Sequence, residues 1–228
     1  MKHRAICIGA GRISAGFNWI QTPYVYTHAD AYLALKERVE LIGFVEPDPE
    51  RAAFAEKKYG LKVWKSLVEV DPVSFDIASV CTQPDIQKPI LDALFRAGTR
   101  GIWCEKPYRG SSNPQCPVQV NYIRRADTTH RLIAECLRGK KSDLFVWARN
   151  DETTRCHFED LAYWWGSTLH YCDNTGEVPS TNSYRVDTGK WSMESRNGGV
   201  EGGFMETMLT NLLDVVDGLP ANLLSPAR

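Results

Sequence analysis

The segment Ala5-Ile6-Cys7-Ile8-Gly9-Ala10-Gly11-Arg12-Ile13-Ser14 decides the fold of this chain. A short apolar run, Ala5–Ile8, leads directly into a glycine-rich turn with the spacing G-x-G-x-x-S. This pattern is typical of a first strand that turns into a helix whose N-terminus binds a dinucleotide pyrophosphate. Gly9 permits the tight turn, and Gly11 permits close approach of a phosphate. Ser14 is small enough to replace the third glycine, although a generic turn remains the alternative for so short a motif.

Downstream of this turn, the first half of the chain alternates apolar runs with helical patterns. Short continuous apolar strands separated by helices predict a parallel sheet that is covered on both faces. We therefore predict an α/β fold with a doubly wound Rossmann sheet over residues 1–117. The further strands are expected at Leu41–Val45, Lys62–Trp64, Ile77–Cys81 and Gly101–Cys104, and the helices at Ala29–Arg38, Pro49–Tyr59 and Asp85–Ala97.

The second half reads as a smaller, abbreviated α+β domain over residues 118–228. The boundary is expected in the Ser-, Asn- and Pro-rich stretch 110–117, which suits a linker. Residues 174–203 are rich in Gly, Ser, Thr and Asn, and predict loops with one or two short strands near 184–186 and 191–193. The other strands are expected at 118–123, 144–148 and 168–172, and the helices at 128–137, 157–165 and 204–216.

The composition excludes several classes of protein. With 228 residues, 43% of them hydrophobic, and a net charge of −1, the chain has no electrostatic footprint for nucleic acid or an anionic membrane surface. No apolar run is long enough for a membrane span, and the apolar start is too short for a signal peptide. Seven cysteines without C-x-x-C spacing indicate reduced, structural thiols. We expect a cytoplasmic protein.

The second predicted strand ends in an acid, Glu46. An acid there accepts hydrogen bonds from the ribose hydroxyls of NAD and repels the 2′-phosphate of NADP. Its distance from Gly9 exceeds the usual 20 or so residues, because an aromatic-rich insertion, Phe17–Thr27, intervenes. The alternative interpretation of Glu46 is a solvated acid at the end of a strand. Arg51 is a candidate phosphate contact, so NADP stays an alternative cofactor. The insertion either lines a sugar pocket or supplies ordinary core and interface anchors.

The fourth strand runs into Glu105-Lys106-Pro107, and this motif resembles the glucose–fructose oxidoreductase/inositol dehydrogenase/rhizopine-catabolism (Gfo/Idh/MocA) family. The resemblance covers residues 4–110 in order. Its other segments are the glycine-rich turn, His28-Ala29-Asp30-Ala31-Tyr32, Glu46-Pro47-Asp48-Pro49-Glu50-Arg51 and Val80-Cys81-Thr82-Gln83-Pro84.

The resemblance implies an NAD(P)-dependent oxidoreductase that acts on a hydroxyl or ketone of a sugar, polyol or related small molecule. It also implies a substrate domain that often mediates oligomers, and we expect a homo-oligomer. Lys106 matches the family's lysine, beside a proline that is often cis. An ammonium near the reacting oxygen stabilises developing negative charge and relays a proton; the alternative is a surface lysine. The cofactor-binding candidates are Gly9, Gly11, Arg12, Ile13, Glu46, Arg51, Thr82, Pro84, Glu105 and Lys106.

In the second half, the segment from His157 to Gly166 resembles the family's His-x-x-Asp-Leu helix. The resemblance implies that His157 is the active-site histidine, and a structural histidine is the alternative. Because Asp160 lies three residues further on the same helical face, it is a candidate to orient the ring. The substrate-binding candidates are Tyr122, Arg124 and Asp160, with His170 beside them.

The chain also departs from the family pattern. Catalytic members carry an Asp four residues before the histidine, where this chain has Thr153, with Asp151 out of register. Gln87 stands where a histidine is common, and the second domain is short. These departures motivate a second hypothesis: a catalytically impaired dinucleotide-binding or regulatory protein of the same fold. A metal site at Cys156 and His157 is disfavoured, because adjacent residues rarely ligate one ion.

Overall fold

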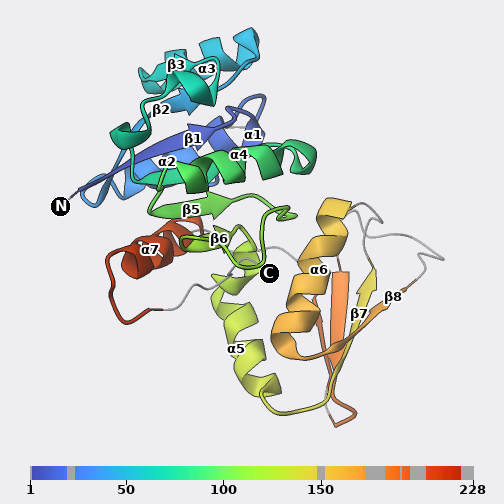
Figure 1. Ribbon diagram of the computed structural model, residues 1–228. Coiled ribbons are helices and arrows are strands. Elements are labelled where there is room, and N and C mark those ends of the chain that lie inside the picture. Colours follow the sequence, from blue (N-terminus) through green and yellow to red (C-terminus); the bar gives the residue numbers. More distant parts are fainter. Residues whose placement is uncertain are drawn as a thin grey trace. The chain divides into compact units, whose positions relative to one another are not determined.

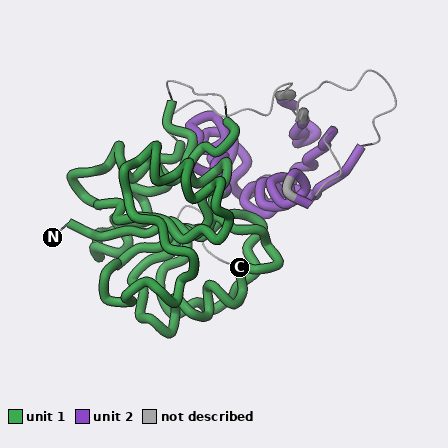
Figure 2. The backbone as a smooth tube through the Cα atoms, turned by 90° about the horizontal axis from the view of Figure 1, so that it is seen from above, with its two compact units in different colours: residues 1–121, 202–228 green, residues 122–201 purple. Residues whose placement is uncertain are grey.

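A computed structural model describes residues 2–19, 24–147, 152–172, 183–190, 192–195 and 204–221 of the chain. The chain divides into two compact units, coloured separately in Figure 2. Unit 1 comprises Met1–Asn121 and Gly202–Arg228, and unit 2 comprises Tyr122–Glu201. Each unit has its own sheet and its own hydrophobic core.

Unit 1 is built on a six-stranded sheet in which every neighbouring pair is parallel (Figure 1). In spatial order its strands are β3 (Lys62–Trp64), β2 (Val39–Val45), β1 (His3–Ile8), β4 (Ile77–Val80), β5 (Gly101–Cys104) and β6 (Val118–Val120). The order runs outward from β1 in both directions, so the topological switch point lies between β1 and β4. Open α/β sheets bind ligands at the carboxyl ends of the strands at such a point. The predicted doubly wound sheet is confirmed.

Helices cover both faces of this sheet. On one face, α1 (Arg12–Ala15), α2 (His28–Ala34), α3 (Pro49–Tyr59) and α7 (Phe204–Val216) form one layer. Lys58 and Tyr59 of α3 both donate to the carbonyl oxygen of Ala15, which fastens α3 to α1. On the other face, α4 (Pro84–Arg96) buries Leu91 and Leu94 against the strands. The 3₁₀ turns η1 (Leu67–Glu69) and η2 (Pro72–Ser74) lie between β3 and β4 in the chain.

The aromatic insertion divides what would be one helix after β1 into two short ones. Helix α1 ends at Gly16 in the left-handed conformation, and α2 begins after Thr27, whose hydroxyl accepts from the Asp30 amide. Helix α2 also ends at Ala34, short of the predicted Arg38. The reason is a turn, in which the carbonyl of Leu35 accepts from the amides of residues 38 and 39 and directs the chain into β2.

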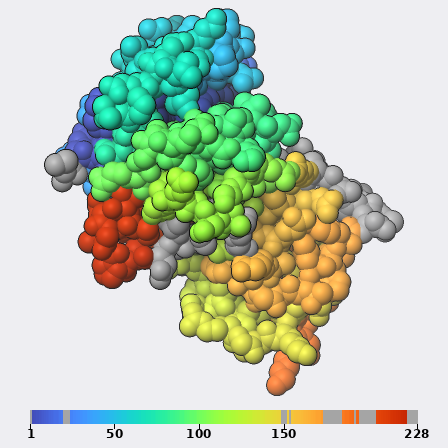
Figure 3. Space-filling model, viewed as in Figure 1, coloured from blue at the N-terminus to red at the C-terminus, as the bar shows by residue number. Residues whose placement is uncertain are grey.

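The division between the units differs from the predicted boundary in two ways. Strand β6 pairs with β5 as the sixth strand of the first sheet, so unit 1 continues past Pro117 to Asn121. Helix α7, expected in the second domain, belongs to unit 1. Its red atoms lie against the green atoms of residues near 100 in Figure 3. The contact is close, because a Cβ on Gly101 would lie 2.6 Å from Val216 Cγ2.

Ion pairs fasten α7 and the turn after it to the start of the sheet. Arg38 donates to Asp214 at 2.7 Å and to Asp217 at 2.8 Å, and His3 Nε2 lies 2.6 Å from Asp217. Burial alone would raise the pKa of the Asp217 carboxyl, but the hydrogen bonds from His3 and Arg38, together with the charges of these two side chains, outweigh burial and lower this pKa. Polar contacts therefore hold α7 in unit 1, in addition to its apolar packing.

Unit 2 carries a mixed sheet with four strands among the described residues. In spatial order they are β10 (Ser192–Ser195), β9 (Ser183–Asp187), β7 (Asp143–Trp147) and β8 (Thr168–Tyr171); β7 and β8 are parallel and the other pairs antiparallel. Its other elements are η3 (Ile123–Arg125), α5 (Thr128–Leu137) and α6 (Glu152–Trp165). The core of the unit joins Phe158 and Leu161 of α6 to Leu144 of β7 and Tyr184 of β9.

Helix α6 begins at Glu152, five residues before the predicted start at His157. An acid suits the first turn of a helix, and Arg155 pairs with Glu159 one turn further on. His157 consequently lies inside the helix rather than at its beginning. Within the described residues, no helix has the length and apolar character that crossing a membrane requires.

Candidate active site

The glycine-rich turn lies at the carboxyl end of β1, beside the turn that follows β4. Gly9 has φ +92°, and a Cβ there would lie 2.8 Å from the carbonyl oxygen of Cys81, so the fold itself requires this glycine. Gly11 is different, because a Cβ there would meet nothing within 4 Å. Its lack of a side chain therefore leaves backbone accessible, as a cradle for a phosphate requires. Helix α1 has only four residues, so this cradle consists of turn amides rather than a long helix.

Glu46 is buried at the end of β2 and faces the glycine-rich turn. One carboxylate oxygen accepts from the Ala10 amide at 2.7 Å and the other from the Asp48 amide at 3.0 Å. The alternative of a solvated strand-end acid is therefore wrong. Each oxygen keeps a second lone pair, which leaves acceptor capacity for a ribose hydroxyl.

Two other cofactor candidates border the same edge of the sheet. Thr82 follows β4, and its buried Oγ1 has no hydrogen-bond partner among the described residues. A buried hydroxyl without a partner is costly, and a bound polar ligand would satisfy it. Pro84 begins α4 directly afterwards. Arg51 lies on the first turn of α3, and its guanidinium stands 5.9 Å from the ring centre of Phe17. These residues fit a dinucleotide along the carboxyl edge.

The Glu-Lys-Pro motif follows β5 at this edge, and its Lys106–Pro107 peptide bond is cis, as the resemblance implies. The side chain of Lys106 is 15% exposed, and its Nζ lies 3.6 Å from Glu105 Oε2. Burial alone would raise the pKa of Glu105. The ammonium of Lys106 and the hydrogen bonds from His28 and Asn121 outweigh this effect and hold that pKa at about 2. The motif therefore carries a buried, ionised carboxylate beside a lysine.

Two residues around Glu105 were not recognised in the sequence as site residues. His28 Nε2 lies 2.9 Å from Glu105 Oε1, and the Asn121 side-chain amide donates to the same oxygen. The signals were present: His28 begins the His-Ala segment, and Asn121 directly follows β6 at its carboxyl end. Sequence position alone does not show that these two segments meet at Glu105.

Gln87, a departure from the family pattern, has a definite place in the structure. Its side-chain Nε2 donates to the carbonyl oxygen of Glu105 at 2.9 Å, and its Oε1 accepts from the Arg109 amide at 3.1 Å. The fully buried side chain thereby joins the two ends of the loop that contains Lys106. In this chain the residue holds the backbone of the Glu-Lys-Pro loop.

His157 lies in unit 2, and Lys106 lies in unit 1. His157 is half-buried on α6, with its ring centre 6.1 Å from that of Tyr122 in an edge-to-face arrangement. The structure describes Thr153 by its backbone only, and Asp151 lies outside the described residues. The catalytic role of His157 stays a prediction.

Asp160 does not present a free carboxylate. Its two oxygens accept from Nε and Nη2 of Arg125 at 2.9 and 2.8 Å, in a buried bidentate pair that joins η3 to α6. This pairing gives Asp160 a structural role that the sequence did not indicate. Arg124 is also buried, with its guanidinium 5.2 Å from the ring centre of Phe158.

The last substrate candidate, His170, lies on β8 and pairs with Asp143 at 2.7 Å. Its ring stacks on Phe145 with centres 4.8 Å apart. Within the described residues, no group of three or more His, Cys, Asp or Glu side chains is arranged to hold a metal ion.

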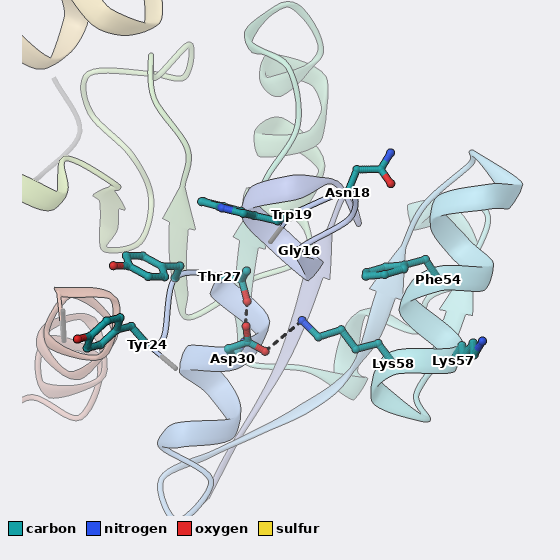
Figure 4. A pocket seen from close by; sticks show the side chains of 10 residues that line it. Gly16, Asn18, Trp19, Tyr24, Thr27, Asp30, Phe54, Lys57 and Lys58 are labelled. Carbon is teal, nitrogen blue, oxygen red and sulfur yellow. Dashed lines mark hydrogen bonds and ion pairs between the residues drawn. The ribbon is translucent and has the colours of Figure 1, made fainter. Parts of the chain in front are cut away.

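The aromatic insertion lines a pocket of about 550 Å³ in unit 1. Trp19, Tyr24 and Tyr26 form part of its wall, and Phe54 and Lys58 of α3 contribute to it as well (Figure 4). Tyr26 also packs on Phe204 of α7, with ring centres 5.6 Å apart. The insertion thus supplies both part of a pocket wall and an aromatic contact with α7; that this pocket binds a sugar stays a prediction. None of the predicted cofactor residues lines this pocket.

Comparison with known proteins agrees with this arrangement. Residues 4–113 match the model of a family described as an oxidoreductase family with an NAD-binding Rossmann fold. No curated protein matches the chain.

Several solved structures share the fold. The WlbA dehydrogenase from Bordetella pertussis, in complex with NADH and UDP-GlcNAcA, is 15% identical with a TM-score of 0.74, over 100% of this chain and 92% of that one. UDP-N-acetylglucosamine 3-dehydrogenase GnnA from Acidithiobacillus ferrooxidans is 12% identical with a TM-score of 0.71, over 100% and 92%. An oxidoreductase from Agrobacterium radiobacter, in complex with NAD⁺, L-tartaric acid and magnesium, is 11% identical with a TM-score of 0.67, over 98% and 91%.

At such identities these structures speak for the fold, whereas the match of residues 4–113 includes the glycine-rich turn, Glu46 and Glu105-Lys106-Pro107. Residues 4–113 therefore match the NAD-binding Rossmann domain of the Gfo/Idh/MocA oxidoreductase family.

Proposed function

We propose that the chain transfers a hydride between NAD and a hydroxyl or ketone of a sugar, polyol or related small molecule. The observation that carries the proposal is Lys106, which follows β5 at the sheet edge that also carries the glycine-rich turn. When bound, NAD accepts or donates the hydride. The turn residues Gly9, Gly11, Arg12 and Ile13 would hold the pyrophosphate. Further along the sheet edge, Glu46 and Arg51 would hold the adenosine ribose, and Thr82, Pro84 and Glu105 would lie along the rest of the cofactor.

Lys106 would act on the reacting oxygen. Oxidation of an alcohol removes a proton from its oxygen, and reduction of a ketone places negative charge there. An ammonium in a largely buried site stabilises that charge and returns the proton. In the same proposal, His157 takes part in the proton transfer, and Tyr122 and Arg124 contact the substrate. Asp160 would act beside them through its pair with Arg125.

The substrate class that we favour is an anionic or nucleotide-linked sugar. An arginine suits a carboxylate or phosphate group, and Arg124, which lies on η3 before α5, is such an arginine. The WlbA structure contains UDP-GlcNAcA, and the Agrobacterium structure contains tartaric acid. Homo-oligomerisation and a cytoplasmic location stay predictions.

The test combines a binding titration with a turnover assay. We expect NAD⁺ to bind with micromolar affinity, and the protein to reduce NAD⁺ with at least one member of a panel of UDP-sugars, sugar acids and polyols. NADH absorbance reports turnover, and NADH oxidation with the corresponding ketones reports the reverse reaction. Binding of NAD⁺ without turnover in either direction would favour the second hypothesis, a nucleotide-binding protein without catalysis. A protein that binds neither NAD⁺ nor NADH contradicts both.

Cofactor preference follows from Glu46. Because its carboxylate is held by two backbone amides at the end of β2, it cannot turn away from a 2′-phosphate. We expect NAD⁺ to bind more tightly than NADP⁺. Replacing Glu46 by Gln keeps the shape and one acceptor oxygen of the side chain but removes its charge. The dissociation constant of NADP⁺ divided by that of NAD⁺ should therefore fall by about tenfold. Calorimetric titration of both cofactors measures it, with Glu56→Gln on α3 as the control. An unchanged ratio in Glu46→Gln means that another residue sets the preference.

A further inference from the structure

A chain of hydrogen bonds leads from the core of unit 1 to Glu105. Tyr32 Oη lies 2.8 Å from Ser79 Oγ, and Ser79 Oγ lies 3.0 Å from His28 Nδ1. His28 Nε2 continues to Glu105 Oε1 at 2.9 Å, and Glu105 Oε2 lies 3.6 Å from Lys106 Nζ. The five groups come from α2, β4 and the loop after β5. The lysine is thus the last group of a polar chain that begins inside the protein.

The chemistry of the groups gives the chain a direction. An ionised carboxylate only accepts hydrogen bonds, so His28 Nε2 carries a hydrogen and donates it to Glu105. With a neutral ring, Nδ1 accepts from the Ser79 hydroxyl, which in turn accepts from Tyr32. A protonated ring would instead donate from Nδ1 to Ser79, and in both cases the Glu105 carboxylate is the acceptor of His28 Nε2.

Asn121 fixes the same carboxylate oxygen from the other side. The indole of Trp103 can only donate, and its Nε1 lies 3.2 Å from Asn121 Oδ1. The amide is therefore oriented with its NH₂ group toward Glu105 Oε1. Glu105 Oε1 thus receives two donors, and Oε2 is the oxygen that faces Lys106.

The chain is not a proton path to solvent. Tyr32, Ser79 and His28 are all 0% exposed, so the end remote from Lys106 lies in the core. A chain that ends there can hold the orientation and charge of Glu105 but cannot exchange protons with water.

We infer that His28 and Asn121 are positioning residues, which hold the Glu105 carboxylate so that it fixes the Lys106 ammonium where the reacting oxygen would lie. The inference rests on the proposed function for the catalytic meaning of Lys106. The contacts that carry it lie within unit 1 and exist without any substrate.

The first experiment measures Lys106 without using activity. The full-length protein is treated with acetic anhydride at fixed pH, and mass spectrometry follows acetylation of Lys106 against the exposed Lys88, which serves as an internal reference. Glu105→Gln should raise the Lys106 rate severalfold, because the ion pair that holds Nζ beside the carboxylate is lost. Asn121→Leu should raise it about threefold or more, because the carboxylate is no longer held.

Gln119 provides the matched control. It lies two residues before Asn121, on β6 and on the same side of that strand, and it is equally buried, but its amide donates to the Met208 carbonyl. Gln119→Leu removes a buried amide in the same way without touching Glu105. Equal Lys106 rates in Asn121→Leu and Gln119→Leu, relative to Lys88, would overturn the inference.

His28 supplies an independent pair of variants if Asn121→Leu does not fold. His28→Leu removes the donor to Glu105, whereas His28→Gln retains one. We expect faster acetylation of Lys106 in His28→Leu and a rate near wild type in His28→Gln. Equal rates in these two variants would contradict the positioning role.

The catalytic readout is made on any substrate that the panel identifies. A positioning role predicts that Asn121→Leu lowers kcat about tenfold or more, whereas the dissociation constant of NAD⁺ and the KM for substrate change less than threefold. An Asn121→Leu variant in which only the KM for substrate changes, with kcat at the wild-type value, would contradict the positioning role. If no substrate is found, the proposed function fails, and acetylation still decides whether His28 and Asn121 act on Lys106.

Discussion

Replacing Lys106 by Met is expected to lower kcat for hydride transfer about 10²- to 10⁴-fold, the range that a positioned proton donor contributes. Methionine keeps most of the side chain's length and its apolar stem but has no charge. The ammonium stands 3.6 Å from an ionised, buried carboxylate, so the variant also leaves that carboxylate without its cation. We therefore expect the variant to be less stable as well. NADH absorbance under saturating cofactor and substrate measures the loss.

Two controls separate catalysis from folding in this experiment. Lys88→Met removes an exposed lysine that pairs with Asp92 on α4, and it should keep the wild-type kcat. Thermal unfolding and NAD⁺ titration of Lys106→Met show whether the variant is folded and still binds cofactor. A folded, NAD-binding Lys106→Met variant with kcat within threefold of wild type would remove Lys106 from the mechanism.

The parts of the fold that could be predicted are those determined by neighbouring residues. Helix α3 has the predicted bounds, because Asp48 caps its first amides, Pro49 starts it and Gly60 ends it in the left-handed conformation. Strand β5 also has its predicted bounds, because its four residues are continuously apolar and fully buried. Signals of this kind are contained in a few adjacent residues.

The assignment of elements to units could not be predicted in the same way. The spacing of Phe204, Met208 and Leu212 shows that α7 has one apolar face, but not what that face contacts. Its partners include Gly101 and, through ion pairs at its end, Arg38, which lie more than a hundred residues earlier in the chain. Strand β6 has a similar ambiguity, because a strand of only three residues, Val118-Gln119-Val120, after a linker fits either sheet.

The candidate site shows the same division between local and distant information. Glu46 was recognised because it stands at the end of an apolar strand, and Lys106 because Glu105-Lys106-Pro107 resembles the family's motif. The partners that hold Glu105 are separated from it by 77 residues for His28 and by 16 for Asn121. Their meeting point depends on the order of strands in the sheet, which places β4, β5 and β6 side by side. Asp160 is the opposite case. Helical spacing predicted that it would contact its neighbour His157, but in the structure Asp160 pairs with Arg125.

The buried carboxylate also predicts how stability depends on pH. The pKa of Glu105 is held at about 2, below the ordinary 4.5, by Lys106, His28 and Asn121 against the opposing effect of burial. The unfolded chain therefore binds a proton at higher pH than the native protein does. The stabilisation is complete above the unfolded pKa and is lost as the pH falls from about 4.5 toward 2. A shift of this size corresponds to roughly 3 kcal/mol of unfolding free energy.

Glu105→Gln removes this contribution while it keeps the size of the side chain. Urea unfolding of the wild type and the variant should differ by roughly 3 kcal/mol at pH 6, and the difference should shrink steadily below pH 4.5. Taking the difference cancels carboxylates common to both proteins. Glu69→Gln, on the exposed turn η1, is the control and should follow the wild type at every pH. A wild-type advantage that stays constant from pH 6 to pH 3 would show that Glu105 stabilises the fold through packing. In that case the charge of Glu105, and with it the electrostatic attraction to Lys106, would not be what stabilises the fold.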